Sequence, residues 1–117
     1  MISPLHSGIS AVSAFSVKMN VTANNVANVN SDGFKKSRTT FQEGPFGGVE
    51  PVVDQVDTPG YTKQIVENGE TREIEASNVD LVEAIVDSIS SQSGFEANLK
   101  TIQTDDEMVG TLLDTIG

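Results

Sequence analysis

The stretch that decides the fold is LVEAIVDSISSQSGFEANLKTIQTDDEMVGTLLDTI, residues 81–116. Apolar side chains recur in it at alternating steps of three and four residues, the spacing of a helix with one apolar face. Gly94 and Gly110 are the weak points of the run. The pattern predicts a C-terminal helix within residues 77–117, about 57 Å long at 1.5 Å per residue, far longer than a small domain needs. The stripe consists of Leu81, Ile85, Ser88, Gln92, Phe95, Leu99, Ile102, Asp106, Val109, Leu113 and Ile116.

Ser77 and Asp80, just before this stripe, form a pair that resembles a capping box, and Asn78 is a competing cap. The helix is therefore expected to begin directly after them.

A second helical stripe occupies the N-terminal end and predicts a helix within residues 1–30. Its many serines and asparagines make it a poor helix in isolation, so we expect it to be ordered only when packed. Ser31, Asp32 and Gly33 form a turn cluster that ends it near Asn30. The stripe consists of Ile2, Leu5, Ile9, Val12, Ser16, Met19, Ala23 and Val26.

Residues 31–76 between the stripes are rich in glycine and proline and contain β-prone runs at 49–56, 61–67 and 70–76. Asn68-Gly69 favours a two-residue type I′ turn, which makes the last two runs a hairpin. Residues 44–48 lack the Gly-Lys-Ser/Thr of a phosphate loop and indicate a flexible connector. The predicted fold is one domain, residues 1–117, mainly α with a small β element. Its long terminal helices pair as a coiled-coil-like layer with an imperfect seam.

The composition of the chain excludes several classes of function. The chain has 117 residues, no cysteine, 5% aromatic residues and a net charge of −10. Residues 1–40 contain four basic residues and one acidic residue, whereas residues 41–117 contain three basic and sixteen acidic residues. This excess of negative charge would repel nucleic acid and argues against it as a partner. No apolar run reaches transmembrane length, and the N-terminus lacks the features of a cleaved secretory signal. The basic neck, residues 35–38, could meet the acidic half of another copy.

Two motifs carry a resemblance. Ala23-Asn24-Asn25-Val26-Ala27-Asn28, followed by Ser31 and Gly33-Phe34-Lys35, resembles the N-terminal signature of flagellar rod, hook and hook-associated proteins. Ser77-Asn78-Val79-Asp80-Leu81-Val82-Glu83 and Glu96-Ala97-Asn98-Leu99-Lys100 resemble the C-terminal part of the same family, in the family's order. Ser31 replaces the usual Thr, and the common Arg before Phe95 is missing.

The resemblance implies a structural subunit of the bacterial flagellar basal-body rod, whose terminal helices line the inner tube of the axis. It implies export by the flagellar type III apparatus without a cleaved signal, and assembly in the periplasm-spanning rod with other copies and other rod or hook subunits. The short middle resembles that of proximal rod proteins. No cofactor, metal or catalytic residue is implied.

The candidate functional residues form an assembly interface on the two helices and at the turn. The sequence allows two roles equally for the side chains of Asn24, Asn25 and Asn28. They form hydrogen bonds with the backbone at the helix end, or they form hydrogen bonds with neighbouring subunits. Gly33 and Phe34 fix where the chain leaves the helical layer. The full set is Leu5, Ile9, Val12, Phe15, Met19, Asn24, Asn25, Asn28, Gly33, Phe34, Ile85, Phe95, Leu99, Ile102, Val109 and Leu113.

Two other function classes compete with this interpretation. A coiled-coil adaptor or secreted helper protein could use the same heptads to bind a partner helix. An enzyme is disfavoured because His6 is the sole histidine and no nucleophile–base set or metal cluster is visible. Asp105, Asp106 and Glu107 point in different directions on a helix, so a solvated face explains them better than a cation site.

Overall fold

The computed structural model describes residues 4–117, so Ile2 of the N-terminal stripe lies outside the described residues. Two helices and two antiparallel strand pairs confirm a mainly α fold with a small β element. The molecule extends over 81 × 24 × 17 Å, and its radius of gyration is 20.8 Å. A globular chain of this length would have a radius of gyration of about 13 Å. The protein is therefore a rod with little room for a shared core.

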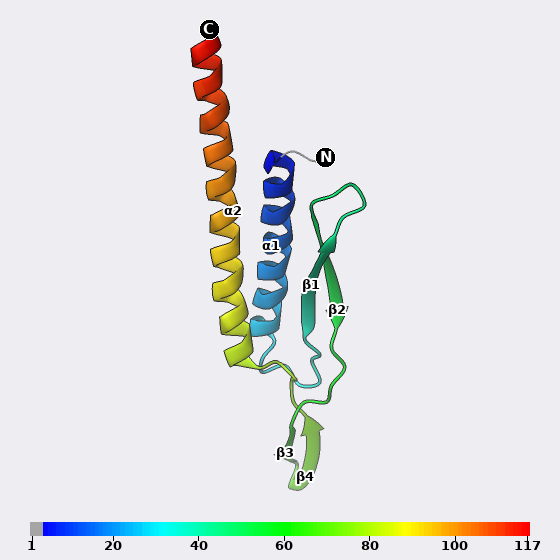
Figure 1. The fold of residues 1–117 in the computed structure, drawn as a ribbon. Helices are drawn as coiled ribbons and strands as arrows, with labels where there is room; N and C mark the ends of the chain where they lie inside the picture. Colours follow the sequence, from blue (N-terminus) through cyan, green and yellow to red (C-terminus); the bar gives the residue numbers. More distant parts are fainter. Residues whose placement is uncertain (1–3) are drawn as a thin grey trace.

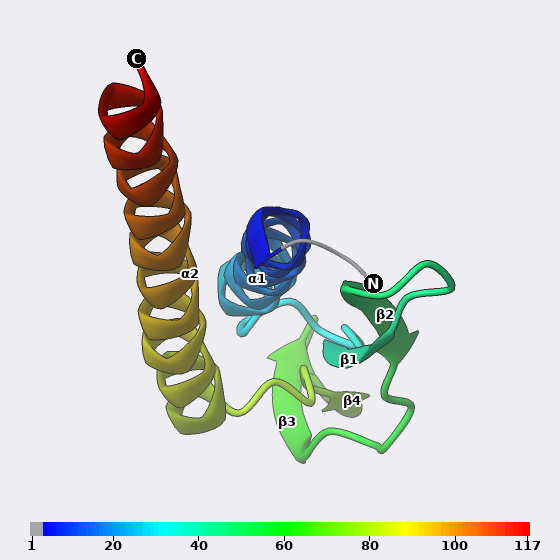
Figure 2. The same ribbon diagram turned by 45° about the horizontal axis from the view of Figure 1, so that its top comes forward.

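The helices α1 (Pro4–Ala27) and α2 (Leu81–Ile116) run antiparallel. Gly8 near the start of α1 approaches Ile102 in α2, whereas Phe15 approaches Gly94. Figures 1 and 2 show α1 between α2 and the hairpin of β1 (Ser37–Glu43) and β2 (Val49–Gln55). At 1.5 Å per residue α2 is about 54 Å long and α1 about 36 Å, so α2 runs on past α1.

The end of α1 differs from the predicted one for a local reason, whereas α2 begins at Leu81, directly after Asp80, as expected. The N-terminal helix ends at Ala27 rather than near Asn30, because the Asn28 amide donates to Asn24 O at 2.9 Å and Ser31 Oγ donates to Asn28 Oδ1 at 3.0 Å. Residues 28–33 then turn, and Gly33 has a φ of 72°. Side-chain bonds thus close the helix end together with backbone bonds, such as that from Val29 N to Val26 O at 3.2 Å.

Asp80 alone caps α2. Its Oδ1 accepts from Val82 N at 2.9 Å and from Glu83 N at 3.3 Å. The predicted capping box with Ser77 is wrong, because the Ser77 hydroxyl accepts from Val79 N before the helix begins.

The predicted hairpin is confirmed as β3 (Thr62–Glu67) and β4 (Glu70–Glu75). Asn68 and Gly69 have φ values of 54° and 78°, as a type I′ turn requires. Among the described helices and strands, this hairpin packs on no third element. It projects beyond the end of α1 that lies far from the C-terminus (Figure 1).

The β1–β2 hairpin was only half predicted. Residues 49–55 form β2, but β1 is a polar strand, SRTTFQE, without the alternation that marks a half-buried strand. Residues 44–48, expected to be a flexible connector, turn the chain between the two strands. Contacts with α1 stabilise the pair: the Phe15 and Phe41 rings meet edge to face at 5.0 Å, and Val49 N donates to Ser10 Oγ at 3.1 Å.

Candidate assembly interface

The two helices meet through small side chains. Ala11, Ala84 and Ser91 are buried. At two points a large side chain of one helix lies on a glycine of the other. A Cβ added to Gly8 would lie 2.9 Å from Ile102 Cγ1, and one added to Gly94 would lie 2.4 Å from Phe15 Cζ. Gly94, expected to be a weak point of α2, is therefore a packing position.

At Gly8 and Ala84 the predicted apolar stripes lie one residue away from the faces that meet, whereas Ile102 of the predicted stripe lies on the seam itself. Ala84 and Ser91 are buried in α2, whereas Ile85 is exposed. Gly8 and Ala11 are buried in α1, and Ile9 is exposed. One residue corresponds to a rotation of about 100° around a helix. The helices do pair, but largely through the neighbouring face, because small residues let their backbones approach.

Large apolar side chains consequently face outward on both helices. Isolated exposed apolar residues are common on monomers, but contiguous sets of them mark interaction surfaces. The exposed set consists of Leu5, Ile9, Val26, Leu81, Val82, Ile85, Val86, Ile89, Leu99, Met108, Val109, Leu112, Leu113 and Ile116.

The sixteen predicted interface residues fall into three groups. Asn25 is buried inside the subunit. The half-buried group consists of Val12, Phe15, Met19, Asn28, Phe34, Phe95 and Ile102. The exposed group consists of Leu5, Ile9, Asn24, Gly33, Ile85, Leu99, Val109 and Leu113.

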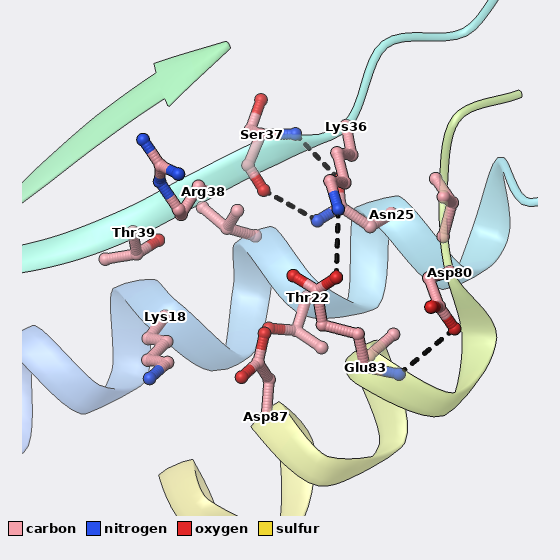
Figure 3. Close-up of a pocket in the computed structure, with 13 residues that line it drawn as sticks. Lys18, Thr22, Asn25, Lys36, Ser37, Arg38, Thr39, Asp80, Glu83 and Asp87 are labelled. Atoms are coloured by element: carbon pink, nitrogen blue, oxygen red, sulfur yellow. Dashed lines mark hydrogen bonds and ion pairs between the residues drawn. The ribbon is translucent and has the colours of Figure 1, made fainter. Parts of the chain in front are cut away.

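Asn25 joins α1 to β1. Its Nδ2 donates to Ser37 O at 2.8 Å, and Ser37 N donates to its Oδ1 at 3.0 Å, so the amide pairs with one backbone unit through two bonds (Figure 3). The side chain is buried beside Thr22. This contact matches neither of the two alternatives considered for the asparagines, since the amide bonds the backbone of a distant segment of the same chain.

Asn25→Ala is expected to leave both backbone groups of Ser37 without their partner. Loss of a buried partner costs about 1–3 kcal/mol, so exchange of the Ser37 amide hydrogen should accelerate roughly tenfold or more. Hydrogen exchange followed by NMR measures it. Asn24→Ala is the matched control, because Asn24 is exposed and its side chain only accepts from Asn28 at 3.4 Å. Equal exchange in both variants would contradict the role of Asn25.

Asn78 was considered only as a helix cap, and its main role was missed. Its Oδ1 accepts from Lys36 N at 2.6 Å, and its Nδ2 donates to Val56 O and Thr58 O, each at 2.8 Å. Its backbone N donates to Phe34 O at 3.2 Å. One residue thus ties the exit from α1, the end of the β1–β2 hairpin and the start of α2. The only signal in the sequence was its place in the Ser77-to-Glu83 motif.

The lysines of the basic neck pair within the chain. Lys35 bonds to Glu75, and Lys36 Nζ lies 3.0 Å from Glu83 Oε2. Arg38 makes no ion pair with any residue of the described chain. Of the basic residues in the neck, only Arg38 is therefore left to form an ion pair with the acidic half of a second copy.

Lys35 holds the pKa of Glu75 below its ordinary value of 4.5, and the Gly60 N–H, which donates to the same carboxylate at 3.0 Å, lowers this pKa further. A carboxylate whose pKa is depressed by folding stabilises the fold above its unfolded pKa. That contribution is lost as the pH falls through the folded pKa. The Lys35–Glu75–Gly60 contact is therefore expected to open below pH 4.5 and to be closed at neutral pH.

An NMR titration of the Gly60 amide shift measures this opening. Glu75→Gln should abolish the transition. Glu73→Gln should leave it intact, because Glu73 makes no side-chain hydrogen bond or ion pair with residues 4–117. A Gly60 shift that follows pH equally in both variants would contradict the assignment.

A pocket of about 250 Å³ lies where α1, β1 and the start of α2 converge (Figure 3). Basic and acidic groups share its lining, and Lys36 pairs with Glu83 across it. Neither histidine nor cysteine lines it. Within residues 4–117, no three or more of His, Cys, Asp and Glu gather as metal ligands would. In the same range, no helix has both the length and the apolar character needed to cross a bilayer.

Comparison with known families matches both ends of the chain. The model "Flagella basal body rod protein" matches residues 5–35, and "Flagellar basal body rod FlgEFG protein C-terminal" matches residues 72–115. The chain belongs to the flagellar rod and hook protein family. In the structure, the first match covers α1 and the turn after it, and the second covers most of β4 and nearly all of α2.

Relatives in the flagellar rod and hook family are similar over parts of their length. The chain is 54% identical to the basal-body rod protein FlgG of Bacillus subtilis over 43 residues, which are 37% of this chain and 16% of that protein. It is 30% identical to the hook protein FlgE of Borreliella burgdorferi over 102 residues, or 86% of this chain and 20% of that protein. It is 43% identical to FlgG of Agrobacterium fabrum over 70 residues, which are 58% of this chain and 24% of that protein. The chain thus spans at most about a quarter of these relatives.

Proposed function

We propose that this chain is a structural subunit of the bacterial flagellar basal-body rod, exported by the flagellar type III apparatus and assembled by helical polymerisation through α1 and α2. One observation carries the proposal: the helices bury small residues against each other and leave large apolar residues outward. An isolated subunit therefore exposes to water much of the area whose burial stabilises proteins. Neighbouring subunits would cover it.

The proposed role involves no cofactor and no catalysis. Its partners are other copies of this chain and other rod or hook subunits, in the part of the flagellum that crosses the periplasm. Only the β1–β2 hairpin, β3 and the first two residues of β4 lie between the family matches. This supports a place among short rod proteins such as those of the proximal rod.

Deleting the gene in a motile bacterium and complementing it tests the role. We expect cells without the chain to lack complete rods in electron micrographs of basal bodies and to be non-motile, and the intact gene to restore both. Intact rods and normal swimming without the chain would refute the proposal and favour an adaptor or helper that binds a partner helix.

Polymerisation is tested separately with the purified chain. Circular dichroism and light scattering over a range of concentrations should show helicity rising together with particle mass, because each helix is completed by neighbours. A stable, fully helical monomer that never assembles, alone or with other rod subunits, would contradict this mechanism.

A further inference from the structure

The face of α2 that packs on α1 continues past the start of α1. Ile102 lies against Gly8, so the next turns of α2 pass Pro4 and then lie beside no described element (Figure 1). The spacing does not change at this point. From Ser91 onward the positions on this face alternate steps of four and three: Ser91, Phe95, Asn98, Ile102, Asp105, Val109, Leu112 and Ile116.

This face becomes more apolar where α1 is absent, with one polar residue, Asp105, among its last four positions, whereas Ser91 and Asn98 are polar beside α1. Beside α1, Ser91 is completely buried. Beyond α1, Val109, Leu112 and Ile116 are 51%, 58% and 76% exposed. α1 covers only one part of this α2 face, and the uncovered part is the more apolar one. Such a pattern indicates that a second helix packs on the uncovered part.

The internal seam indicates what that second surface should be. There, Ile102 lies on Gly8 and Phe15 lies on Gly94, so large side chains of one helix pack on small residues of the other. From Ser13 onward, exposed and uncharged residues without a large apolar side chain occupy the outward face of α1, which neither α2 nor the hairpin covers (Figure 2). Solvent-facing helix surfaces normally carry charges. This part of the face consists of Ser13, Asn20, Ala23, Asn24 and Ala27, and the exposed Leu5 and Ile9 precede it on the same side of the helix.

Charge selects α1 over α2 as the partner. Residues 105–116 carry Asp105, Asp106, Glu107 and Asp114 and no base, and α2 as a whole has a single base, Lys100. A second α2 would repel them. Residues 4–27 contain no acid, so α1 accepts this acidic segment without repulsion.

We propose that the last third of α2, residues 105–116, packs on the outward face of α1 of a second copy of this chain. The inference rests on the proposed assembly and names the two surfaces that meet. Because the two patches differ, each copy offers one and accepts the other, and the contact repeats without closing into a dimer. Such a contact extends the two-helix layer from one subunit to the next.

Disulfide trapping tests the contact, since the chain has no cysteine of its own. Leu112→Cys is mixed with Ser13→Cys, Asn20→Cys or Ala23→Cys in purified full-length chain at assembling concentration. The mixtures are then oxidised. Each pair is also co-expressed, and basal bodies isolated from those cells are oxidised. Within one chain, Ala23 and Leu112 are roughly 37 Å apart along the helix axes. A disulfide joins Cα atoms within about 7 Å, so any bond is between copies.

Thr111→Cys is the matched control, because Thr111 is exposed one residue away, on the side of α2 turned from the seam. We expect at least one α1 cysteine to give roughly fivefold more covalent dimer with Leu112→Cys than with Thr111→Cys, as the geometric requirement of a disulfide dictates. Equal yields, or no dimer, in assembled material would overturn the proposed contact, indicate another docking surface or another rod subunit, and leave the rod function standing. Failure of the unmodified chain to assemble in either setting would contradict the rod function itself.

Discussion

Gly94→Leu is expected to separate α1 from α2 and to lower the free energy of unfolding by about 3 kcal/mol. Even a single Cβ at this position would overlap Phe15, whose ring atoms Cζ and Cε1 would lie 2.4 and 2.5 Å away. The Phe15 ring cannot easily retreat, because its other side meets the Phe41 ring at 5.0 Å. The substitution therefore disturbs the helix seam and the packing of the β1–β2 hairpin together.

Gly110→Leu is the matched control. Gly110 lies in the same helix, but a Cβ there would meet nothing within 4 Å. Leu is the better helix former by about 0.5–1 kcal/mol, so this variant should be slightly more stable than the native chain. The urea midpoint of the helical circular dichroism signal, at a concentration where the native chain is helical, compares the two. If both variants shifted the midpoint alike, the close approach at Gly94 would not be what orders the helices.

Elements defined by neighbouring residues were predictable. Asn68-Gly69 specifies its own turn, because positive φ values at both positions favour these residue types, and the flanking strands follow from it. The two helices were likewise predictable from their spacing. Their ends were harder to place, since Asn28 and Asp80 each act through side-chain bonds that compete with other nearby caps.

Ile102 of the predicted stripe does lie on the seam, but at Gly8 and Ala84 the seam was predicted one residue from its true position, because hydrophobic patterns weight large side chains. Ile9 and Ile85 stand out in the sequence, whereas Gly8 and Ala84 do not. Where these two helices approach closely, small residues form the contact, and large residues such as Ile9 and Ile85 stay exposed. Hydrophobicity alone cannot separate a helix face that is covered inside the subunit from one that stays exposed.

Contacts between distant segments were not predictable. β1 is polar, and only its pairing with β2 and the bond between Asn25 and Ser37 reveal it as a strand. Asn78 bonds to residues 20, 22 and 42 positions away, a distance over which spacing in the sequence carries no information. These contacts exist only once the chain has folded.

Asn78→Ala is expected to cost about 2–4 kcal/mol, because it removes three side-chain hydrogen bonds at once and leaves partly buried backbone groups unpaired. The backbone atoms that lose their hydrogen-bond partner are Lys36 N, Val56 O and Thr58 O. Hydrogen exchange at the Lys36 amide reports the local effect, and the urea midpoint reports the global one. Asn28→Ala is the control, since the Asn28 amide bonds only to residues within one helical turn.

Asn78→Asp refines the test because it keeps the shape and the acceptor for Lys36 N. It turns a donor into an acceptor that faces two carbonyl oxygens, so it should be as harmful as Asn78→Ala and should leave exchange at Lys36 less affected. Both variants keep the sequences of α1 and α2 but release the junction that orients the helices relative to the hairpins. Assembly should therefore fail at concentrations where helicity is still measurable. Normal assembly of either variant would show that neighbouring subunits, and not Asn78, set that orientation.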